Sequence, residues 1–242
     1  MISSNIPTPM RALAIGAHPD DVEFGAGATL AKWAANGCEV SLLICTDGSK
    51  GSWDPAADTA ELVEIRKVEQ RAAAEALGVS GEIVFLDYVD GELDAGLEER
   101  EIVASWIRKI KPDVVLGHDP WKRYRLHPDH RNAGQLTVEG IVVARDPFFL
   151  KDSILPPHRP SELFLFEPEE CDHLETSEGY EQQKLNALQS HKSQYVSTMG
   201  ITKDNETKGL QDFRTRITEE LSAFGDLAGI EMAEGFKRIR EI

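Results

Sequence analysis

Residues 11–46 read RALAIGAHPDDVEFGAGATLAKWAANGCEVSLLICT and decide the fold class. Residues 11–16 and 40–46 are short apolar runs rich in branched side chains, which is typical of buried strands. Residues 26–36 between them hold helix formers and end before Gly37, a common helix stop. A strand, a helix and a strand in this order predict two parallel strands joined by a crossover helix.

The same alternation continues along the chain. Further strands are predicted at residues 83–86, 113–117 and 163–166. Further helices are predicted at residues 59–77, 97–109 and 128–144, which end near Gly78, Pro112 and Pro147. We therefore expect an α/β fold with a mostly parallel sheet and helices on both faces.

The length of 242 residues favours a single domain with one core. We expect this core to span about residues 10–170. From about residue 171 to residue 242 the chain turns polar and charged, with helical patterns near residues 180–190 and 212–224. We therefore expect a C-terminal helical extension without a second core.

The composition excludes several function classes. The chain has 26 basic and 42 acidic residues, and its net charge of -16 disfavours nucleic acid as a partner. The first ten residues lack the pattern of a signal peptide, and no window has the apolar length of a membrane span. The expected protein is soluble and cytoplasmic. Cys38, Cys45 and Cys171 form no CxxC pair, and we expect them to be reduced and outside any metal site.

In open parallel sheets, ligands bind beyond the carboxyl ends of the strands. The first predicted strand is followed by AHPDDVE, residues 17–23, where one imidazole and three carboxylates crowd together. A cation would relieve the repulsion between these carboxylates. His18 and Asp21, three residues apart around a tight turn, can both point inward as metal ligands, which leaves Asp20 free beside them.

A second cluster follows the fourth predicted strand, where HPDHR, residues 127–131, opens a helix. Pro128 suits the first helical position, so His127 and His130 fall one turn apart on nearly the same face. Two ligands from the first cluster and one from the second leave a fourth coordination position open to water, as in catalytic zinc sites. The same ligand types also fit iron, cobalt or manganese.

Each cluster by itself also has a purely structural interpretation. The HxxD pattern can be a capped helix start, and HPDH can open a surface helix in which Asp129 interacts favourably with the helix dipole. Both clusters, however, follow predicted strands of one sheet. That coincidence favours a shared metal site.

Three segments carry a resemblance to a known family. AHPDDVE at residues 17–23, RKVEQRAAAEALGV at residues 66–79 and HPDHRNAG at residues 127–134 resemble the LmbE-like or PIG-L-like zinc-dependent N-deacetylases. Members of that family act on N-acetylglucosaminyl conjugates. The resemblance covers about residues 10–200 and implies a Rossmann-like α/β fold, in agreement with the alternation of strands and helices.

The resemblance also implies a division of roles between the two clusters. The implied metal ligands are His18, Asp21 and His130. Zn²⁺ is the default ion, and Fe²⁺ or Co²⁺ are alternatives. Asp20 is implied as the general base that takes a proton from the attacking water.

Roles for the remaining candidates follow from the same resemblance. His127 is implied as the residue that steadies the oxyanion or protonates the leaving amine, and we predict that Asp129 orients it. Arg66 and Asp90 are implied sugar-binding residues. Whether Asp20 or His127 returns the proton to the amine stays open.

These assignments predict a zinc-dependent hydrolase of linear amides that deacetylates a small N-acetylglucosamine-type conjugate. A homo-oligomer is compatible with this reading. Two other classes stay open. A metal-dependent phosphoesterase also uses a metal, a base and an arginine, although two-metal phosphatases have more ligands. A non-catalytic binding module on the same fold would need neither Asp20 nor His127.

The approach to HPDH departs from many members of the family. WKRYRL, residues 121–126, places three positive charges at the rim, where many relatives have a glycine-rich approach. We hypothesise that these charges meet an anionic group of the substrate. The alternative is a solvated loop paired to nearby acids.

Four further residues have simpler interpretations. Gly25 and Gly27 do not complete a dinucleotide motif, and we expect them to allow close packing of a helix on the sheet. His118 is predicted to be structural or solvated. Trp53, in a loop after the second strand, could close over a sugar ring or form an oligomer contact.

Overall fold

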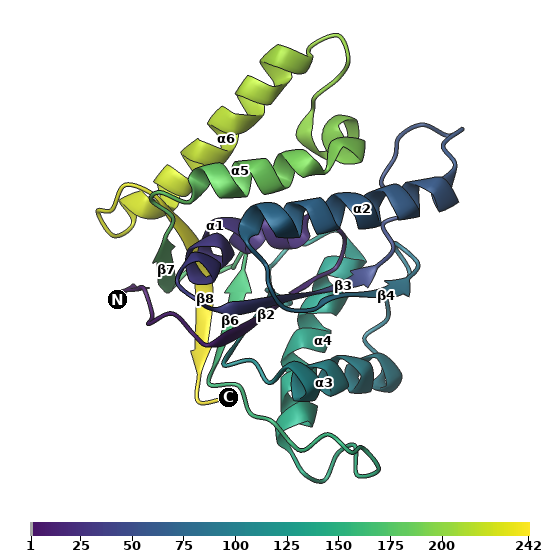
Figure 1. Cartoon of the computed structure of the whole chain (residues 1–242), viewed down its shortest axis with the longest axis vertical. Coiled ribbons are helices and arrows are strands. Elements are labelled where there is room, and N and C mark those ends of the chain that lie inside the picture. The colour runs from purple at the N-terminus through teal and green to yellow at the C-terminus, as the bar shows by residue number, and fades with distance from the viewer. Residues whose placement is uncertain (1) are drawn as a thin grey trace.

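The computed structural model describes residues 2–242 and contains one eight-stranded sheet (Figure 1). Its strands are β1 (Ser3–Ser4), β2 (Arg11–Gly16), β3 (Glu39–Thr46), β4 (Ile83–Tyr88), β5 (Val114–His118), β6 (Glu162–Phe166), β7 (His173–Thr176) and β8 (Ala233–Arg240). They lie in the order β1-β7-β8-β6-β5-β2-β3-β4. The strands pair in parallel, except that β8 runs antiparallel to both β6 and β7.

Helices cover both faces of this sheet, as predicted (Figure 1). One face carries α3 (Leu97–Ile110) and α4 (Pro128–Arg145); the other carries α1 (Asp21–Ala35), α2 (Thr59–Leu77), α5 (Glu181–Ser190) and α6 (Glu206–Asp226). Short turns η1 (Lys192–Gln194) and η2 (Tyr195–Met199) join α5 to α6. Along β2, Leu13 and Ile15 enter one core while Ala12 and Ala14 enter the other, because successive side chains of a strand point to opposite faces.

Helix α1 begins at Asp21, five residues before the predicted start at residue 26. The glycines that weaken the helical pattern are required by packing. A Cβ on Gly25 would collide with the Phe166 ring of β6, which confirms the predicted close approach of helix and sheet. A Cβ on Gly27 would lie 3.1 Å from Lys184 Cγ, so this glycine packs against α5 instead.

The C-terminal segment differs from the predicted helical extension. Residues 171–242 contain α5 and α6 but also β7 and β8, and β8 inserts between β6 and β7. Charged residues interrupt the apolar pattern of β8, AEGFKRIR, which is why sequence periodicity did not identify it. Glu234 of β8 is nevertheless buried, because it accepts hydrogen bonds from the amides of Ala28 (3.0 Å) and Thr29 (2.7 Å). Phe236 joins the core beneath α1.

The same segment also contributes a small core of its own, which the sequence did not indicate. Helices α5 and α6 each bury a stripe of apolar side chains, and the segment between them adds further apolar side chains. The C-terminal segment is therefore polar in composition, but its helices are amphipathic. The buried members are Leu185, Leu188, Met199, Ile201, Phe213, Ile217 and Leu221.

The cysteines are free, and two of them, Cys38 and Cys45, are buried in the two main cores. Among the helices of residues 2–242, none combines the length and apolar character that crossing a membrane requires.

Candidate functional site

A cavity of about 490 Å³ opens at the carboxyl ends of the parallel strands β2 to β5. The loop after β2 contributes His18 and Asp20, the loop after β4 contributes Asp90, and the start of α4 contributes His127 and His130. Its volume lies within the usual range of small-molecule sites, and its place at the strand ends is the one expected for an open parallel sheet.

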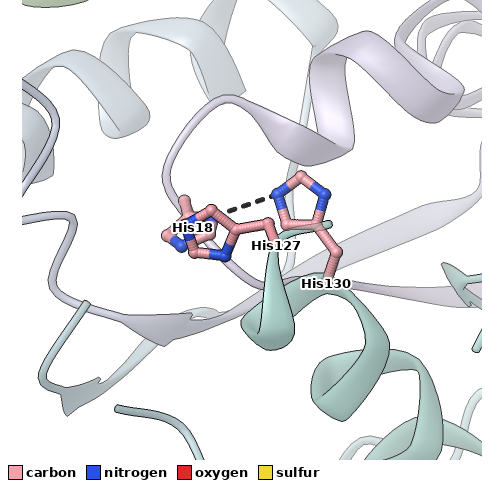
Figure 2. A group of neighbouring side chains, drawn as sticks. All are labelled: His18, His127 and His130. Atoms are coloured by element: carbon pink, nitrogen blue, oxygen red, sulfur yellow. Dashed lines mark hydrogen bonds between the residues drawn. The ribbon is translucent and has the colours of Figure 1, made fainter. Parts of the chain in front are cut away.

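Three prospective metal ligands form a small triangle beside this cavity. His18 Nδ1 lies 3.2 Å from His130 Nε2 and 3.3 Å from Asp21 Oδ2. Asp21 Oδ1 lies 3.3 Å from His130 Nε2. Donor atoms about 2.0–2.2 Å from a tetrahedral metal lie about 3.3 Å apart. The two imidazole nitrogens and the Asp21 carboxylate, which turns one oxygen towards each ring, therefore lie at distances that suit one ion such as zinc. Figure 2 shows the contact between the His18 and His130 rings as a dashed line, with His127 next to His18.

The far side of the His18 ring is held by two buried carboxylates. Its Nε2 lies 3.1 Å from Asp129 Oδ2 and 3.2 Å from Asp90 Oδ1. Asp129 also accepts hydrogen bonds from the amides of Gly91 (2.6 Å) and Leu93 (3.3 Å), which fix its position. A carboxylate behind a ligating histidine is a common support for a metal site. Asp129 therefore contacts His18 directly, and its carboxylate also lies within 4.8 Å of a His127 nitrogen, so its effect on His127 stays a prediction.

These carboxylates also determine the charge of His18. Burial opposes protonation of the ring, but the hydrogen bonds to Asp129 and Asp21 outweigh it and raise the pKa of His18 well above its usual value. These contacts therefore favour the protonated form of the ring. A metal has to displace this proton when it binds.

His118 also belongs to this site, which the sequence interpretation missed. Its ring is buried, its Nε2 lies 3.2 Å from Asp21 Oδ2, and Asp21, His118 and His130 form a second group of donors close enough for a metal. The available signal was its position as the last residue of β5, at the same end of the sheet as both clusters. The prediction that His118 is structural or solvated was therefore incomplete.

Asp20 lies beside the donor triangle in a strained backbone conformation. Its φ of 103° is in the left-handed region, which costs a non-glycine residue about 1–3 kcal/mol. Two side chains of α2 hold the turn: Gln70 Oε1 accepts from the Asp20 amide (3.1 Å), and Arg66 donates to Pro19 O (2.5 Å). Gln70 is itself held by Glu23, whose carboxylate accepts from its amide nitrogen (2.6 Å).

The carboxyl group of Asp20 has the properties of a general base. Burial raises its pKa to about 6, against the opposing charge of Arg66 and with a further contribution from Asp21. A carboxyl group with a pKa near neutrality at a cavity wall can both take and return a proton.

The remaining candidates border the cavity in different ways. Arg66 is buried and donates mainly to backbone oxygens, to Pro19 and to Gly48 (3.0 Å). The other carboxylate oxygen of Asp90 accepts from the Lys50 amide (3.1 Å). The His127 side chain is 43% exposed, and its Nε2 lies 3.8 Å from Asp90 Oδ1.

The positive loop before α4 does not border the cavity as hypothesised. Arg125 pairs with Glu167 (2.7 Å), and Arg123 lies 3.8 Å from Glu169. The lysine that lines this cavity is instead Lys50, in the loop after β3. The alternative, a loop paired to nearby acids, describes these residues better.

The family model described as GlcNAc-PI de-N-acetylase, PIG-L, matches residues 13–141, more than half of the chain. This protein belongs to the PIG-L family. The matched span runs from β2 into α4 and includes both halves of the donor triangle. The family membership agrees with the resemblance seen in the sequence motifs.

Among PIG-L relatives, the diacetylchitobiose deacetylase of Thermococcus kodakarensis is 36% identical over 188 residues, which are 76% of this chain and 70% of that protein. A 1D-myo-inositol 2-acetamido-2-deoxy-alpha-D-glucopyranoside deacetylase of Thermomonospora curvata is 34% identical over 165 residues, 58% of this chain and 55% of that relative. The N,N'-diacetylchitobiose deacetylase structure from Pyrococcus horikoshii superposes with a TM-score of 0.84 at 30% identity. That match covers 96% of this chain and 84% of the other.

Proposed function

We propose that this PIG-L protein is a metal-dependent amide hydrolase that removes the acetyl group from an N-acetylglucosamine-type conjugate. The observation that carries the proposal is the triangle of His18, Asp21 and His130, with Asp20 and His127 beside it in one cavity. His127 is also close enough to His18 and His130 to bind the same ion, but we propose that it stays unligated. A structural metal site would need neither of these two neighbours. Relatives of this chain that act on diacetylchitobiose and on an acetamido-glucoside support the substrate class.

We propose Zn²⁺ as the ion, with Fe²⁺ or Co²⁺ as alternatives that the same donors accept. When bound, the ion would supply an acidified water and polarise the amide carbonyl. We propose that Asp20 would take a proton from the attacking water, because its buried carboxyl group borders the cavity beside the three proposed ligands. Gln70 and Arg66 keep this carboxyl group in place through the turn.

We propose that His127 acts on the oxygen and on the leaving amine of the substrate amide. It lies edge-on to His18, with ring centroids 4.6 Å apart, and stacks on His130 at 5.2 Å. From there an N–H of the ring can donate to the developing oxyanion or to the leaving amine. The proton that the amine needs comes from Asp20 or from His127.

We propose that Asp90 accepts a hydrogen bond from a sugar hydroxyl, since its carboxylate borders the cavity between His18 and His127. Arg66 also borders the cavity, but both of its terminal nitrogens donate to backbone oxygens. Its effect on the sugar is therefore proposed to be indirect, through the turn that carries Asp20.

The test uses purified protein loaded with Zn²⁺ and follows free amine released from N-acetylglucosamine and N,N'-diacetylchitobiose, with p-nitrophenyl phosphate as the phosphoesterase control. We expect amine release. Asp20→Asn should lower kcat by about 100-fold or more while one zinc per chain is retained. Asp204→Asn, an exposed acid far along the chain, is the matched control and should leave kcat unchanged.

Three results would contradict the proposal. Hydrolysis of the phosphate ester without amide cleavage would favour the phosphoesterase. Tight zinc binding without turnover of any acetamido sugar would favour a binding module. Full activity of Asp20→Asn would remove Asp20 from the mechanism.

A further inference from the structure

Arg125 places a buried positive charge directly behind one of the proposed metal ligands. Its Nη1 lies 2.9 Å from Nδ1 of His130, on the opposite side of the ring from the donor triangle. The same nitrogen donates to Glu167 Oε2 at 2.7 Å and lies 3.4 Å from Nδ1 of His118. The Arg125 side chain is only 9% exposed. Solvent therefore screens this charge little.

The hydrogen-bond chemistry of His130 makes this contact informative. A neutral imidazole carries one hydrogen, and if Nε2 binds a metal the hydrogen is on Nδ1. That N–H needs an acceptor, whereas a guanidinium group only donates. The observed contact instead suits a ring whose hydrogen is on Nε2, pointing at His18 and Asp21. Metal binding by His130 and its hydrogen bond from Arg125 therefore exclude each other.

Glu167 is the carboxylate that pairs with Arg125. It follows β6, its Oε2 accepts from Arg125, and the same oxygen lies 3.6 Å from His118 Nδ1. Hydrogen bonds from His118 and the charge of Arg125 lower the pKa of Glu167 to about 2 although burial opposes this, so the carboxylate is charged near neutral pH.

We propose that Arg125 and Glu167 are positioning residues that set the metal affinity of the site in opposite directions. Arg125 weakens metal binding, because its N–H occupies Nδ1 of His130 and adds positive charge behind the ring. Glu167 strengthens metal binding, because its negative charge offsets that of Arg125. This inference rests on the proposed function, which places the metal at His18, Asp21 and His130.

The test measures the Zn²⁺ dissociation constant by competition with a chromophoric chelator at one pH. We expect Arg125→Gln to bind Zn²⁺ about tenfold more tightly than the unchanged protein, and Glu167→Gln about tenfold more weakly. Arg125→Lys keeps the positive charge, so its Zn²⁺ dissociation constant should lie closer to that of the unchanged protein than the constant of Arg125→Gln does. Arg123→Gln and Glu169→Gln remove the same charges from a neighbouring, more exposed pair and should leave the constant unchanged.

The opposite signs separate this role from a merely structural one. If the ion pair only braced the loop, both variants would bind Zn²⁺ more weakly and both would unfold at lower temperature. Weaker or unchanged binding by Arg125→Gln would overturn the inference, even with an unchanged unfolding temperature. If the unchanged protein binds no Zn²⁺ or Co²⁺ at all, the proposed metal site and this inference both fail. If the unchanged protein binds one ion but Arg125→Gln and Glu167→Gln do not change the Zn²⁺ affinity in opposite directions, only this inference fails and the proposed metal site stands.

Discussion

Adjacent aspartates in one tight turn have opposite electrostatic properties. Although burial opposes it, the charges of His130 and His118 lower the pKa of Asp21 well below its usual value. Burial raises the pKa of Asp20 to about 6. The left-handed backbone of Asp20 separates the two carboxyl groups, one towards the histidines and one towards Arg66. Paired carboxyl groups with divergent pKa values are typical of acid–base sites.

Gln70 should affect catalysis through Asp20 without touching substrate. In Gln70→Ala the Asp20 amide and the Glu23 carboxylate both lose a partner, so the strained turn is less firmly held. We expect kcat to fall about tenfold to 100-fold with little change in KM, because a small displacement of the base is costly. Steady-state kinetics of the zinc-loaded enzyme would measure this. Gln211→Ala, on the exposed face of α6, is the control, and an unchanged kcat for Gln70→Ala would refute the role.

Trp53 should select for the size of the substrate. Its side chain is 81% exposed and lines the cavity, so the indole can pack on a second sugar ring. We expect Trp53→Ala to raise KM about fivefold for N,N'-diacetylchitobiose and much less for N-acetylglucosamine, from an aromatic contact worth about 1 kcal/mol. Trp121→Ala is the control, because Trp121 is 59% exposed but does not line the cavity. Equal changes in KM for both sugars would contradict this.

At the scale of secondary-structure elements, the first residues of helices position side chains of the site. The first helical residue of α4 is Pro128, which fixes the turn that brings His127 and His130 to the cavity. Helix α2 spans the predicted residues 59–77, because the Asp58 side chain caps its start and Gly78, with a φ of 75°, ends it. Such end signals are local in sequence, which is why they could be predicted.

A buried ion pair connects α5 to β8, and breaking it should be costly. Lys184 Nζ lies 2.6 Å from Glu234 Oε1, and both side chains are almost fully buried. Lys184→Met would leave the Glu234 charge without its partner, so we expect the free energy of unfolding to fall by about 3–5 kcal/mol. Urea denaturation would measure it. Lys109→Met removes a lysine from the exposed pair with Glu82 and should change stability by less than about 1 kcal/mol. Equal losses in the free energy of unfolding for Lys184→Met and Lys109→Met would contradict the argument that burial makes the loss of Lys184 costly.

At the scale of the whole molecule, Glu175 of β7 contacts segments that lie far apart in the sequence. It accepts hydrogen bonds from the Ile6 amide (2.9 Å) and Lys32 (2.6 Å), and lies 2.8 Å from His173 Nε2. Burial opposes its ionisation, but His173 and Lys32 outweigh this and lower the pKa of Glu175. A carboxyl group with a lowered pKa in the folded state stabilises the protein above its unfolded pKa, about 4.3. This stabilisation is lost as the pH falls through the folded value.

Glu175→Gln should therefore lower the free energy of unfolding most near pH 7. The difference from the unchanged protein should shrink as the pH falls below about 4 towards the lowered pKa of Glu175. Denaturation curves over this pH range would test it. A difference that is constant with pH would show that the charge of Glu175 does not contribute to folding.

The amino-acid sequence by itself determined the βαβ alternation, the exact span of α2 and the two ionisable clusters at the strand ends. These features depend on periodicity and on motifs within a few residues, so they can be read without the fold. The parallel sheet then requires the clusters to meet, because the carboxyl ends of its strands lie at one edge. That is why His18, Asp21 and His130 could be grouped in advance.

Only the tertiary structure decided which partner each side chain has. Asp129 contacts His18 across 111 positions of sequence, His118 contacts Asp21 across 97, and β8 pairs antiparallel with β6 although charges interrupt its pattern. The hydrogen bond from Arg125 to His130 likewise depends on the path of a loop that has no regular period. Such contacts reflect burial and hydrogen bonding between distant segments, which no local pattern encodes.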